Sequence, residues 1–331
     1  MHSPNNFGNT LQEYRDIYQN NALANISGHG ILRMTGQDAL DLLNRLSTNK
    51  LLDLEAGYGT STILTTNKGR IIDLLRVINT GQELILLTNP NTTKRVVEWI
   101  DLYTFGEDIQ VDDISAKTNL FSVWGKNVQS ILDENGVIIS TLYQNEKISV
   151  AGQEVTIIKT DRFGLESFDI LSGSSVADTV WLSLINAGFS AVGSDSLEIV
   201  RIEQGVPKHG AELGEDYNPL EAGLESHISG TKGCYIGQEV ILRLNTYQKV
   251  QKRLRGIVLS DDQPIDSCDL ELDGKQIGFI TSSVKSPILG KTLALGYIKA
   301  PNTDIDQEVD IKKSRNMAVR GKIIELPLTY K

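Results

Sequence analysis

The chain has 331 residues, of which 40% are hydrophobic and 22% are charged, and its formal net charge is −10. This length predicts two or three domains, and the acidic balance argues against a general affinity for nucleic acid or for acidic membranes. No apolar run approaches the roughly 18 residues that a membrane-spanning helix needs, and the N-terminal residues resemble neither a secretory signal nor a transit peptide. We therefore expect a cytoplasmic protein.

The two cysteines, Cys234 and Cys268, are too few for a disulfide framework, so we expect both to be thiols. Cys234 has no His or Cys residue at metal-ligand spacing, because His209 and His227 match no recognised zinc pattern with it. The sequence therefore predicts no complete metal site.

The first part of the chain mixes helical and strand patterns. Apolar residues at helical spacing predict an amphipathic helix over residues 35–47. The stretch 60–88 then alternates apolar strands with turns that contain Asn and Gly, which is typical of antiparallel hairpins. Further helices are predicted over about residues 92–103 and 176–187, and together these elements indicate an α+β body.

From about residue 251 the pattern changes to short β segments, and Asp273-Gly274 marks a tight turn between two of them. Such segments are typical of a small antiparallel barrel or sandwich. We therefore expect an N-terminal region over residues 1–248 and a C-terminal β domain over residues 249–331.

Asp73 lies on a predicted strand whose alternation places it on the same face as Ile71, Leu75 and Val77. A carboxylate among apolar neighbours costs free energy unless another group pairs with it. One interpretation is a hydrogen-bond partner from the protein's own fold. The other is an acid that faces a ligand and takes part in proton transfer.

A segment rich in Gly and Pro follows the predicted helix around Leu197 and Val200, and Gly205 is the expected helix stop. A loop of this length inside a compact domain is often functional. Glu203 and Glu221 stand where regular structure gives way to the loop, and a carboxylate there can accept paired hydrogen bonds from an edge such as that of a pterin. The alternative for each is a solvated charge at a helix end.

The segment "SGTKGCYIGQEVILRL" (residues 229–244) places Cys234 between two glycines and close to Lys232. We expect the thiol to stand at or near the N-terminus of a helix that continues through Ile241 and Leu244, where helix amides and the lysine would lower its pKa. The alternative is a small buried hydrophobic residue, because free cysteine is often buried.

The stretch over residues 240–260 contains no acidic residue but five basic ones. One interpretation is a solvated strand edge protected by lysine and arginine. The other is a binding site for several carboxylates or phosphates, formed by Arg243, Lys249, Lys252, Arg253 and Arg255.

The residues "KGCYIGQE" (Lys232 to Glu239) resemble the signature of the YgfZ family of folate-binding proteins, the iron–sulfur cluster biogenesis branch of the GcvT (glycine-cleavage T-protein, aminomethyltransferase) superfamily. Residues 38–77 and 201–224 resemble two further blocks of the family, so the resemblance covers nearly the whole chain. It implies an aminomethyltransferase fold of the α+β class, with two interlocked α+β lobes plus a C-terminal antiparallel β-barrel, arranged as a ring around a folate pocket.

The resemblance also implies roles for particular residues. It makes Glu203 the carboxylate that grips the pterin ring and Asp73 an acid that faces the reactive folate nitrogens. Leu74 stands where T-proteins often carry a second acid, a departure that bears on transfer chemistry more than on folate binding. The catalytic candidates are then Cys234 and Asp73, and the candidates for binding tetrahydrofolate or a one-carbon derivative are Glu203, Glu221, Lys232, Tyr235, Gln238 and Arg243.

Three functions remain open. The first is a tetrahydrofolate-binding accessory protein that assembles or repairs iron–sulfur clusters in client enzymes, including enzymes that modify tRNA. The second is a folate-dependent aminomethyl or one-carbon transferase of the T-protein type, and the third is a folate-binding regulator without turnover. One-carbon transfer needs an acid and an electrostatic cradle but no thiol, so Cys234 favours the accessory function. We expect folate and iron–sulfur client or assembly proteins as partners, without direct binding of nucleic acid or membrane.

Overall fold

The structure is a computed structural model that describes residues 4–247, 249–265, 267–314 and 317–330. Residue 248, at the predicted domain boundary, lies outside the described residues. The chain divides into two compact units, each assembled from three separate segments. The first unit comprises residues 1–66, 72–196 and 226–236, and the second comprises residues 67–71, 197–225 and 237–331.

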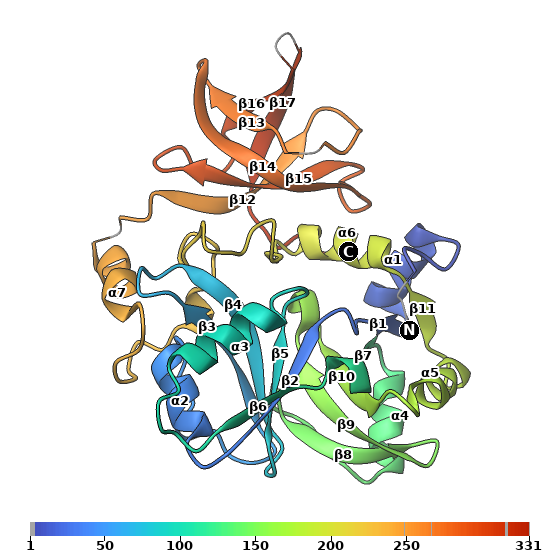
Figure 1. Ribbon diagram of the computed structural model, residues 1–331. Helices are drawn as coiled ribbons and strands as arrows, with labels where there is room; N and C mark the ends of the chain where they lie inside the picture. The colour runs from blue at the N-terminus through green and yellow to red at the C-terminus, as the bar shows by residue number, and fades with distance from the viewer. Residues whose placement is uncertain (1–3, 248, 266, 315–316, 331) are drawn as a thin grey trace. The chain divides into compact units, whose positions relative to one another are not determined.

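A six-stranded sheet forms one lobe of the first unit (Figure 1). Its strands, in sheet order, are β11 (Ser190–Val192), β1 (Ala22–Asn25), β7 (Thr118–Trp124), β10 (Ser167–Gly173), β9 (Gln153–Thr160) and β8 (Asn145–Val150). β1 and β11 are parallel, whereas the other neighbours are antiparallel. One face of the sheet forms a core with α4 (Asn127–Glu134) and α5 (Ala177–Asn186), in which Val123 and Ile170 contact side chains such as Leu132 and Leu184.

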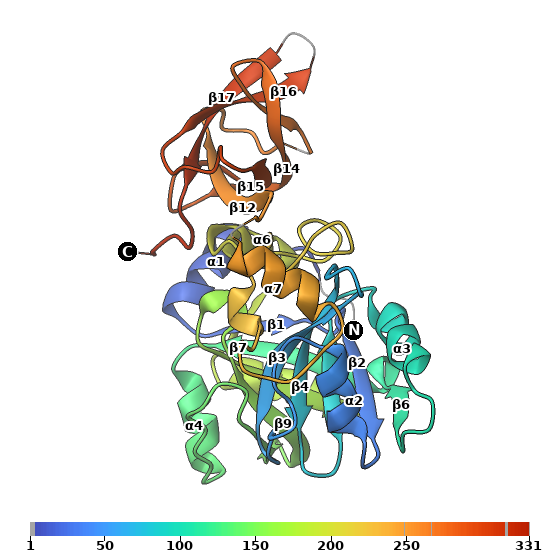
Figure 2. The ribbon, with the colours of Figure 1, turned by 90° about the vertical axis from the view of Figure 1, so that its left-hand side faces the viewer.

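A five-stranded sheet forms the other lobe of the first unit. Its order is β3 (Gly59–Thr65), β4 (Ile71–Asn79), β5 (Leu84–Thr88), β2 (Gly30–Thr35) and β6 (Gln110–Asp113). The helices α2 (Ala39–Leu46) and α3 (Thr93–Leu102) pack into a shared core with this sheet, supplied by residues such as Leu42, Leu43, Val96 and Ile100 (Figure 2).

The chain path interlocks the two lobes of the first unit. The chain enters the six-stranded sheet with β1, runs through all strands of the five-stranded sheet from β2 to β6, and then returns to the six-stranded sheet with β7. In Figure 1 the blue strand β1 accordingly lies among green strands. This arrangement confirms the interlocked α+β lobes that the family resemblance implied.

A buried ion pair lies on the face of the six-stranded sheet opposite the α4 and α5 core. Arg162 donates a hydrogen bond of 2.7 Å from Nη2 to Asp169 Oδ2, and its Nε donates one of the same length to Ser122 Oγ. Ser122 and Asp169 are paired neighbours on β7 and β10, and the side chains of all three residues are buried. The sheet therefore pairs its buried charges internally, as burial requires.

The second unit contains a closed antiparallel barrel of six strands. Their order is β12 (Lys252–Leu259), β15 (Lys291–Lys299), β14 (Lys275–Ser286), β13 (Asp269–Leu272), β16 (Glu308–Ser314) and β17 (Met317–Ile324). Side chains such as Ile257, Leu270 and Ile323 fill its interior. Asp273 and Gly274 have φ values of 51° and 73° and connect β13 to β14, so the predicted tight turn is confirmed.

The remaining helices show where sequence patterns succeeded and failed. The helices predicted over about 92–103 and 176–187 correspond to α3 and α5, whereas α1 (Thr10–Gln19) and α4 were not anticipated. α6 (Ser194–Glu203) ends before Gly205, whose φ is 69°, as expected for a helix stop. In the part of the chain that the structure describes, none of the helices is long and apolar enough to span a membrane.

Candidate functional site

Lys232 anchors the loop that carries the cysteine. Its side chain is buried, and its Nζ donates hydrogen bonds of 2.6 Å each to the carbonyl oxygens of Asn44, Ser47 and Asn49. These carbonyls lie at and just beyond the C-terminal end of α2, where backbone oxygens lack helical partners and a cation is favourable. Burial lowers the pKa of Lys232 to about 8. Lys232 therefore caps α2 and fixes the loop to it.

Three further contacts hold the same loop, which we call the cysteine loop (residues 226–236). The Oγ1 of Thr48 donates a hydrogen bond of 2.7 Å to the carbonyl of His227, and one ring nitrogen of His227 lies 2.6 Å from Ser61 Oγ. At the other end, Thr65 Oγ1 donates a hydrogen bond of 2.7 Å to the carbonyl of Ile236. The loop is thus pinned to the five-stranded lobe on both sides of the cysteine.

Tyr235 contributes a buried ring and a hydroxyl that lacks a partner. Its side chain is 7% exposed, and the Nζ of Lys232 lies 5.1 Å from the ring centroid, within the range of a cation–π contact. The hydroxyl makes no hydrogen bond to any described residue. Burial raises the pKa of Tyr235 to about 12, so the hydroxyl remains a donor at neutral pH. A bound ligand with an acceptor atom would satisfy it.

Cys234 is exposed between these two anchored residues. The alternative that it is a buried packing residue is therefore wrong. The helix expected at or near Cys234 is α7 (Gln238–Thr246), which begins four residues after the cysteine and follows Gly237 with its φ of 84°. Cys234 thus lies near the helix but precedes its N-cap residue. Lys232 directs its ammonium group to the carbonyls of α2. What the fold provides is a solvent-accessible thiol on a fixed loop.

Asp73 receives hydrogen bonds from its own lobe. Its Oδ1 accepts from the Leu74 amide at 2.9 Å and from Asn89 Nδ2 at 2.7 Å, while its Oδ2 accepts from the Asn89 amide at 3.0 Å and from Thr92 Oγ1 at 2.6 Å. The carboxylate is fully buried, as the strand pattern predicted. Because Thr92 is the N-cap residue of α3, Asp73 fixes the turn between β5 and that helix. This geometry favours the interpretation that Asp73 is hydrogen-bonded by the protein's own fold over the interpretation that it is an acid facing a ligand.

Glu203 is a buried carboxylate in the second unit. It is the last residue of α6 and has no exposed surface. Its Oε1 accepts a short hydrogen bond from Ser286 Oγ and a longer one of 3.4 Å from the Ile288 amide. Both donors belong to β14 or the turn after it, so Glu203 fixes the end of α6 to the barrel.

Glu221 is also buried, with 5% exposure, so the interpretation of a solvated helix-end charge is wrong. Its Oε2 accepts a hydrogen bond of 3.0 Å from the Asn218 amide and lies 3.4 Å from Nη1 of Arg70. Arg70 also donates to the Asp216 carbonyl at 3.2 Å. No local sequence pattern pointed to Arg70 as a partner of Glu221, because the two residues are 151 positions apart.

Lys252, at the start of β12, lies over an aromatic stack in the second unit. The rings of Tyr217 and Tyr297 are parallel within 11° at a centroid distance of 4.1 Å, and Lys252 Nζ lies 4.4 Å from the centroid of Tyr217. Burial lowers the pKa of Lys252. This residue is therefore a half-buried cation with aromatic contacts, unlike a lysine of a solvated strand edge.

The other residues of the predicted basic stretch differ in exposure, and Arg253 and Arg255 are half-buried like Lys252. Arg243 and Lys249 are exposed at and after the end of α7, and Gln238 is half-buried at its start. Arg253 Nη1 lies 3.6 Å from Glu225 Oε1.

Of the sequence-predicted site residues, the structure brings together Lys232, Cys234 and Tyr235 on one loop of the first unit. Asp73 has its own network in that unit, while Glu203, Glu221, Gln238 and Arg243 belong to the second unit.

Known protein families match both parts of the chain. Residues 1–232 match the family described as the GCVT N-terminal domain, and residues 252–329 match the glycine cleavage T-protein C-terminal barrel domain. The chain belongs to the glycine-cleavage T-protein family. This result confirms the superfamily that the sequence resembled.

Individual relatives cover almost the whole chain. A chloroplastic protein of Arabidopsis thaliana, named as a transferase, is 31% identical over 95% of this chain and 73% of its own length. The aminomethyltransferase of Moorella thermoacetica is 28% identical over 98% of this chain and 90% of its own length. The crystal structure of aminomethyltransferase T from Bartonella henselae has a TM-score of 0.85 at 20% identity, covering 96% of this chain and 89% of that protein. The family fold is therefore established for this chain.

Proposed function

We propose that this protein is a tetrahydrofolate-binding accessory protein of the YgfZ type. It uses the Cys234 thiol in the assembly or repair of iron–sulfur clusters in client enzymes, among them enzymes that modify tRNA. Its partners are folate and iron–sulfur client or assembly proteins in the cytosol.

The exposure of Cys234 on a pinned loop carries this proposal. Lys232 and Tyr235 are buried on either side of the thiol, so the loop presents it in a fixed place without covering it. Thiolates bind the iron of iron–sulfur clusters, so an accessible thiol is suited to act as a ligand of iron. Folate-dependent one-carbon transfer requires no thiol, so a fixed and accessible cysteine fits cluster chemistry better than transfer.

Folate binding is supported separately by groups that suit it. The buried Tyr235 hydroxyl lacks a partner among the described residues and would donate to an acceptor of the cofactor. We propose Glu203 and Glu221, which both belong to the second unit, as ligands of the pterin. When bound, tetrahydrofolate would supply a one-carbon carrier. The contribution of the chain's own residues is to bind and orient it.

A second candidate is aminomethyl or one-carbon transfer, because relatives named aminomethyltransferase align over 97% and 98% of the chain. The hydrogen bonds to Asp73 count against it. A carboxylate that accepts four hydrogen bonds within its own lobe is poorly placed to exchange a proton with a ligand. The absence of a second acid at Leu74 points the same way.

Two activity measurements on the full chain distinguish these functions. In cells that lack the native protein, we expect expression of the chain to restore the activity of iron–sulfur enzymes. In a glycine-cleavage assay with the lipoyl carrier protein and tetrahydrofolate, we expect no turnover. Turnover in the assay without restoration in cells would establish the transferase and overturn the proposal. Calorimetry with tetrahydrofolate tests the shared folate site.

A further inference from the structure

A pocket lies in the first unit, built entirely from residues outside the cysteine loop. Its cavity volume is about 450 Å³, which is within the size range of small-molecule sites. The end of α1, the end of β7 and the first turn of α4 form one side of it. The end of β9 and the segment that leads into β10 form the other side. We call it the Trp124 pocket.

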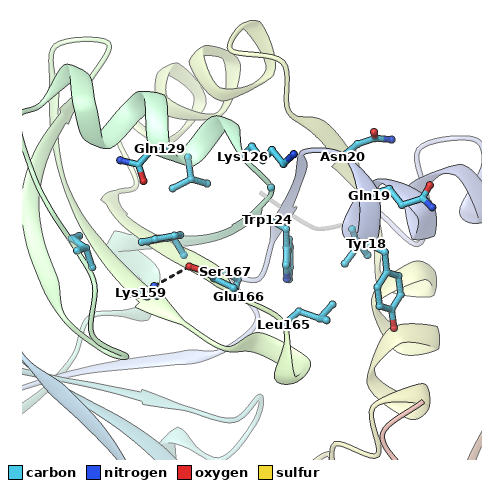
Figure 3. A pocket seen from close by; sticks show the side chains of 15 residues that line it. Tyr18, Gln19, Asn20, Trp124, Lys126, Gln129, Lys159, Leu165, Glu166 and Ser167 are labelled. Carbon is cyan, nitrogen blue, oxygen red and sulfur yellow. Dashed lines mark ion pairs between the residues drawn. The ribbon is translucent and has the colours of Figure 1, made fainter. Parts of the chain in front are cut away.

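The indole of Trp124 lines this pocket and carries an unused donor. Its side chain is 1% exposed, and its Nε1–H has no hydrogen-bond partner in the described part of the chain. Figure 3 shows the ring standing in the pocket, with Lys126 on one side and Leu165 on the other. An indole N–H is a donor only, and buried donors are nearly always satisfied. The pocket therefore offers a hydrogen bond to an acceptor atom that the protein itself does not supply.

The charged side chains of the pocket carry a positive excess. Lys159 Nζ pairs with Glu166 Oε1 at 2.8 Å, which leaves the exposed ammonium group of Lys126 as a further cation. Lys126 is also the N-cap residue of α4, so the positive end of that helix dipole adds to the positive potential of the pocket. A local positive excess in a chain of net charge −10 favours an anionic ligand.

Apolar side chains form the rest of the lining. Ile17, Val128, Ile139 and Phe168 are buried members of the wall, and Leu165 is half-buried at its edge. The pocket thus combines an apolar wall, one buried donor and a cationic edge, which is the usual composition of a small-molecule site.

We propose that the Trp124 pocket binds a small aromatic carboxylate. The Trp124 Nε1–H donates a hydrogen bond to an acceptor atom on the ring of the ligand, the apolar wall covers that ring, and the carboxylate of the ligand lies at the ammonium group of Lys126. This site is independent of the proposed folate residues, none of which lines the pocket.

Three matched probes test the site on the full chain. Isonicotinate has a ring nitrogen acceptor and a carboxylate, benzoate lacks the ring acceptor, and isonicotinamide lacks the charge. The readout is the ¹H–¹⁵N signal of the indole N–H groups of the three tryptophans, with the Trp124 signal assigned through Trp124→Phe. We expect isonicotinate to move the Trp124 proton downfield in a saturable way. Benzoate should bind without this downfield shift, and isonicotinamide should bind about tenfold more weakly.

Charge variants provide a second readout that does not depend on the tryptophan. Lys126→Gln should weaken isonicotinate binding about tenfold, whereas Lys94→Gln, a change at an exposed lysine of α3, should leave it unchanged. Lys126 is exposed, so its variant should fold normally. A Trp124 signal that responds to none of the probes, equal responses to all three, or equal effects of the two lysine variants would overturn the proposal.

Discussion

The ammonium nitrogen of Lys232 lies 2.6 Å from the carbonyl oxygen of Ser47, although the two residues are 185 positions apart in the chain. Ser47 is the C-cap residue of α2, and the Asn44 and Asn49 carbonyls bind the same nitrogen. The signature lysine therefore completes a helix end of the five-stranded lobe. Its first role is to hold the cysteine loop in place.

The first prediction concerns this anchor. Lys232→Met should lower the free energy of unfolding by about 3 kcal/mol, because three carbonyls lose a charged donor while the apolar stem is retained. Urea unfolding monitored by circular dichroism measures the loss. Lys94→Met, at a lysine whose side chain is 89% exposed, is the matched control and should change stability little. Equal stability of the two variants would contradict the anchoring role.

The pKa of Lys232 predicts a pH dependence. Burial lowers this pKa from 10.5 to about 8 in the folded protein. Between these values the unfolded state binds the proton more tightly, so the contribution of Lys232 to stability rises with pH across this window. The stability difference between the parent protein and Lys232→Met should therefore shift by roughly 1 to 3 kcal/mol in favour of the parent between about pH 7 and about pH 10. A difference that stays constant with pH would count against a perturbed lysine.

Asp73 gives the third prediction. Asp73→Asn should lower the free energy of unfolding by about 2 kcal/mol, since the amide cannot accept all four hydrogen bonds of the carboxylate. Asp101→Asn, a change at an exposed acid of α3, is the control and should be nearly neutral. If Asp73→Asn folds as stably as the parent protein yet abolishes a folate-dependent activity, Asp73 is a reacting acid and the structural interpretation fails.

The fourth prediction separates structural from ligand roles of Glu203. If Glu203 binds the pterin, Glu203→Gln should weaken the binding free energy of tetrahydrofolate by about 1.5 to 3 kcal/mol. Calorimetry would detect this difference. Glu154→Gln, at an acid whose side chain is 70% exposed, serves as the control. Unchanged affinity combined with a lower melting temperature would assign Glu203 a structural role, through its contacts with Ser286 and Ile288.

The fold was predictable to the extent that local patterns determine it. Hydrophobic periodicity located α3 and α5, and the Asp-Gly pair located the turn between β13 and β14. The interlocking of the lobes followed only from the family resemblance. β1 pairs with β7 and β11, which lie about a hundred or more positions away, and local propensity does not reveal such pairings.

The candidate site was less predictable because its partners are distant in sequence. The motif identified Lys232, Cys234 and Tyr235, but the carbonyls that bind Lys232 lie more than 180 positions away. The helix predicted through Ile241 begins at Gln238, because Gly237 has a left-handed φ of 84° and ends the preceding loop. The local pattern did not reveal where this boundary lies. Similarly, no sequence pattern identified Asn89 and Thr92 as the hydrogen-bond donors to Asp73.

Thiol reactivity follows from the exposures of the two cysteines. Cys234 is exposed, whereas Cys268 is half-buried and packs against the barrel core. A mild alkylating agent should therefore modify Cys234 in the native protein well before Cys268, as peptide mass spectrometry would show. Labelling of Cys234 only after denaturation would mean that the thiol is not accessible in solution.

The most direct measurement of the proposed function is the activity of iron–sulfur client enzymes in cells that lack the native protein and express Cys234→Ala. Because the side chain is small and exposed, this change should leave folding and tetrahydrofolate affinity nearly intact, and Cys268→Ala provides the matched control. The proposal predicts that Cys268→Ala restores client activity and that Cys234→Ala, expressed at the same level, does not. Full restoration by Cys234→Ala would contradict the proposed role of the thiol.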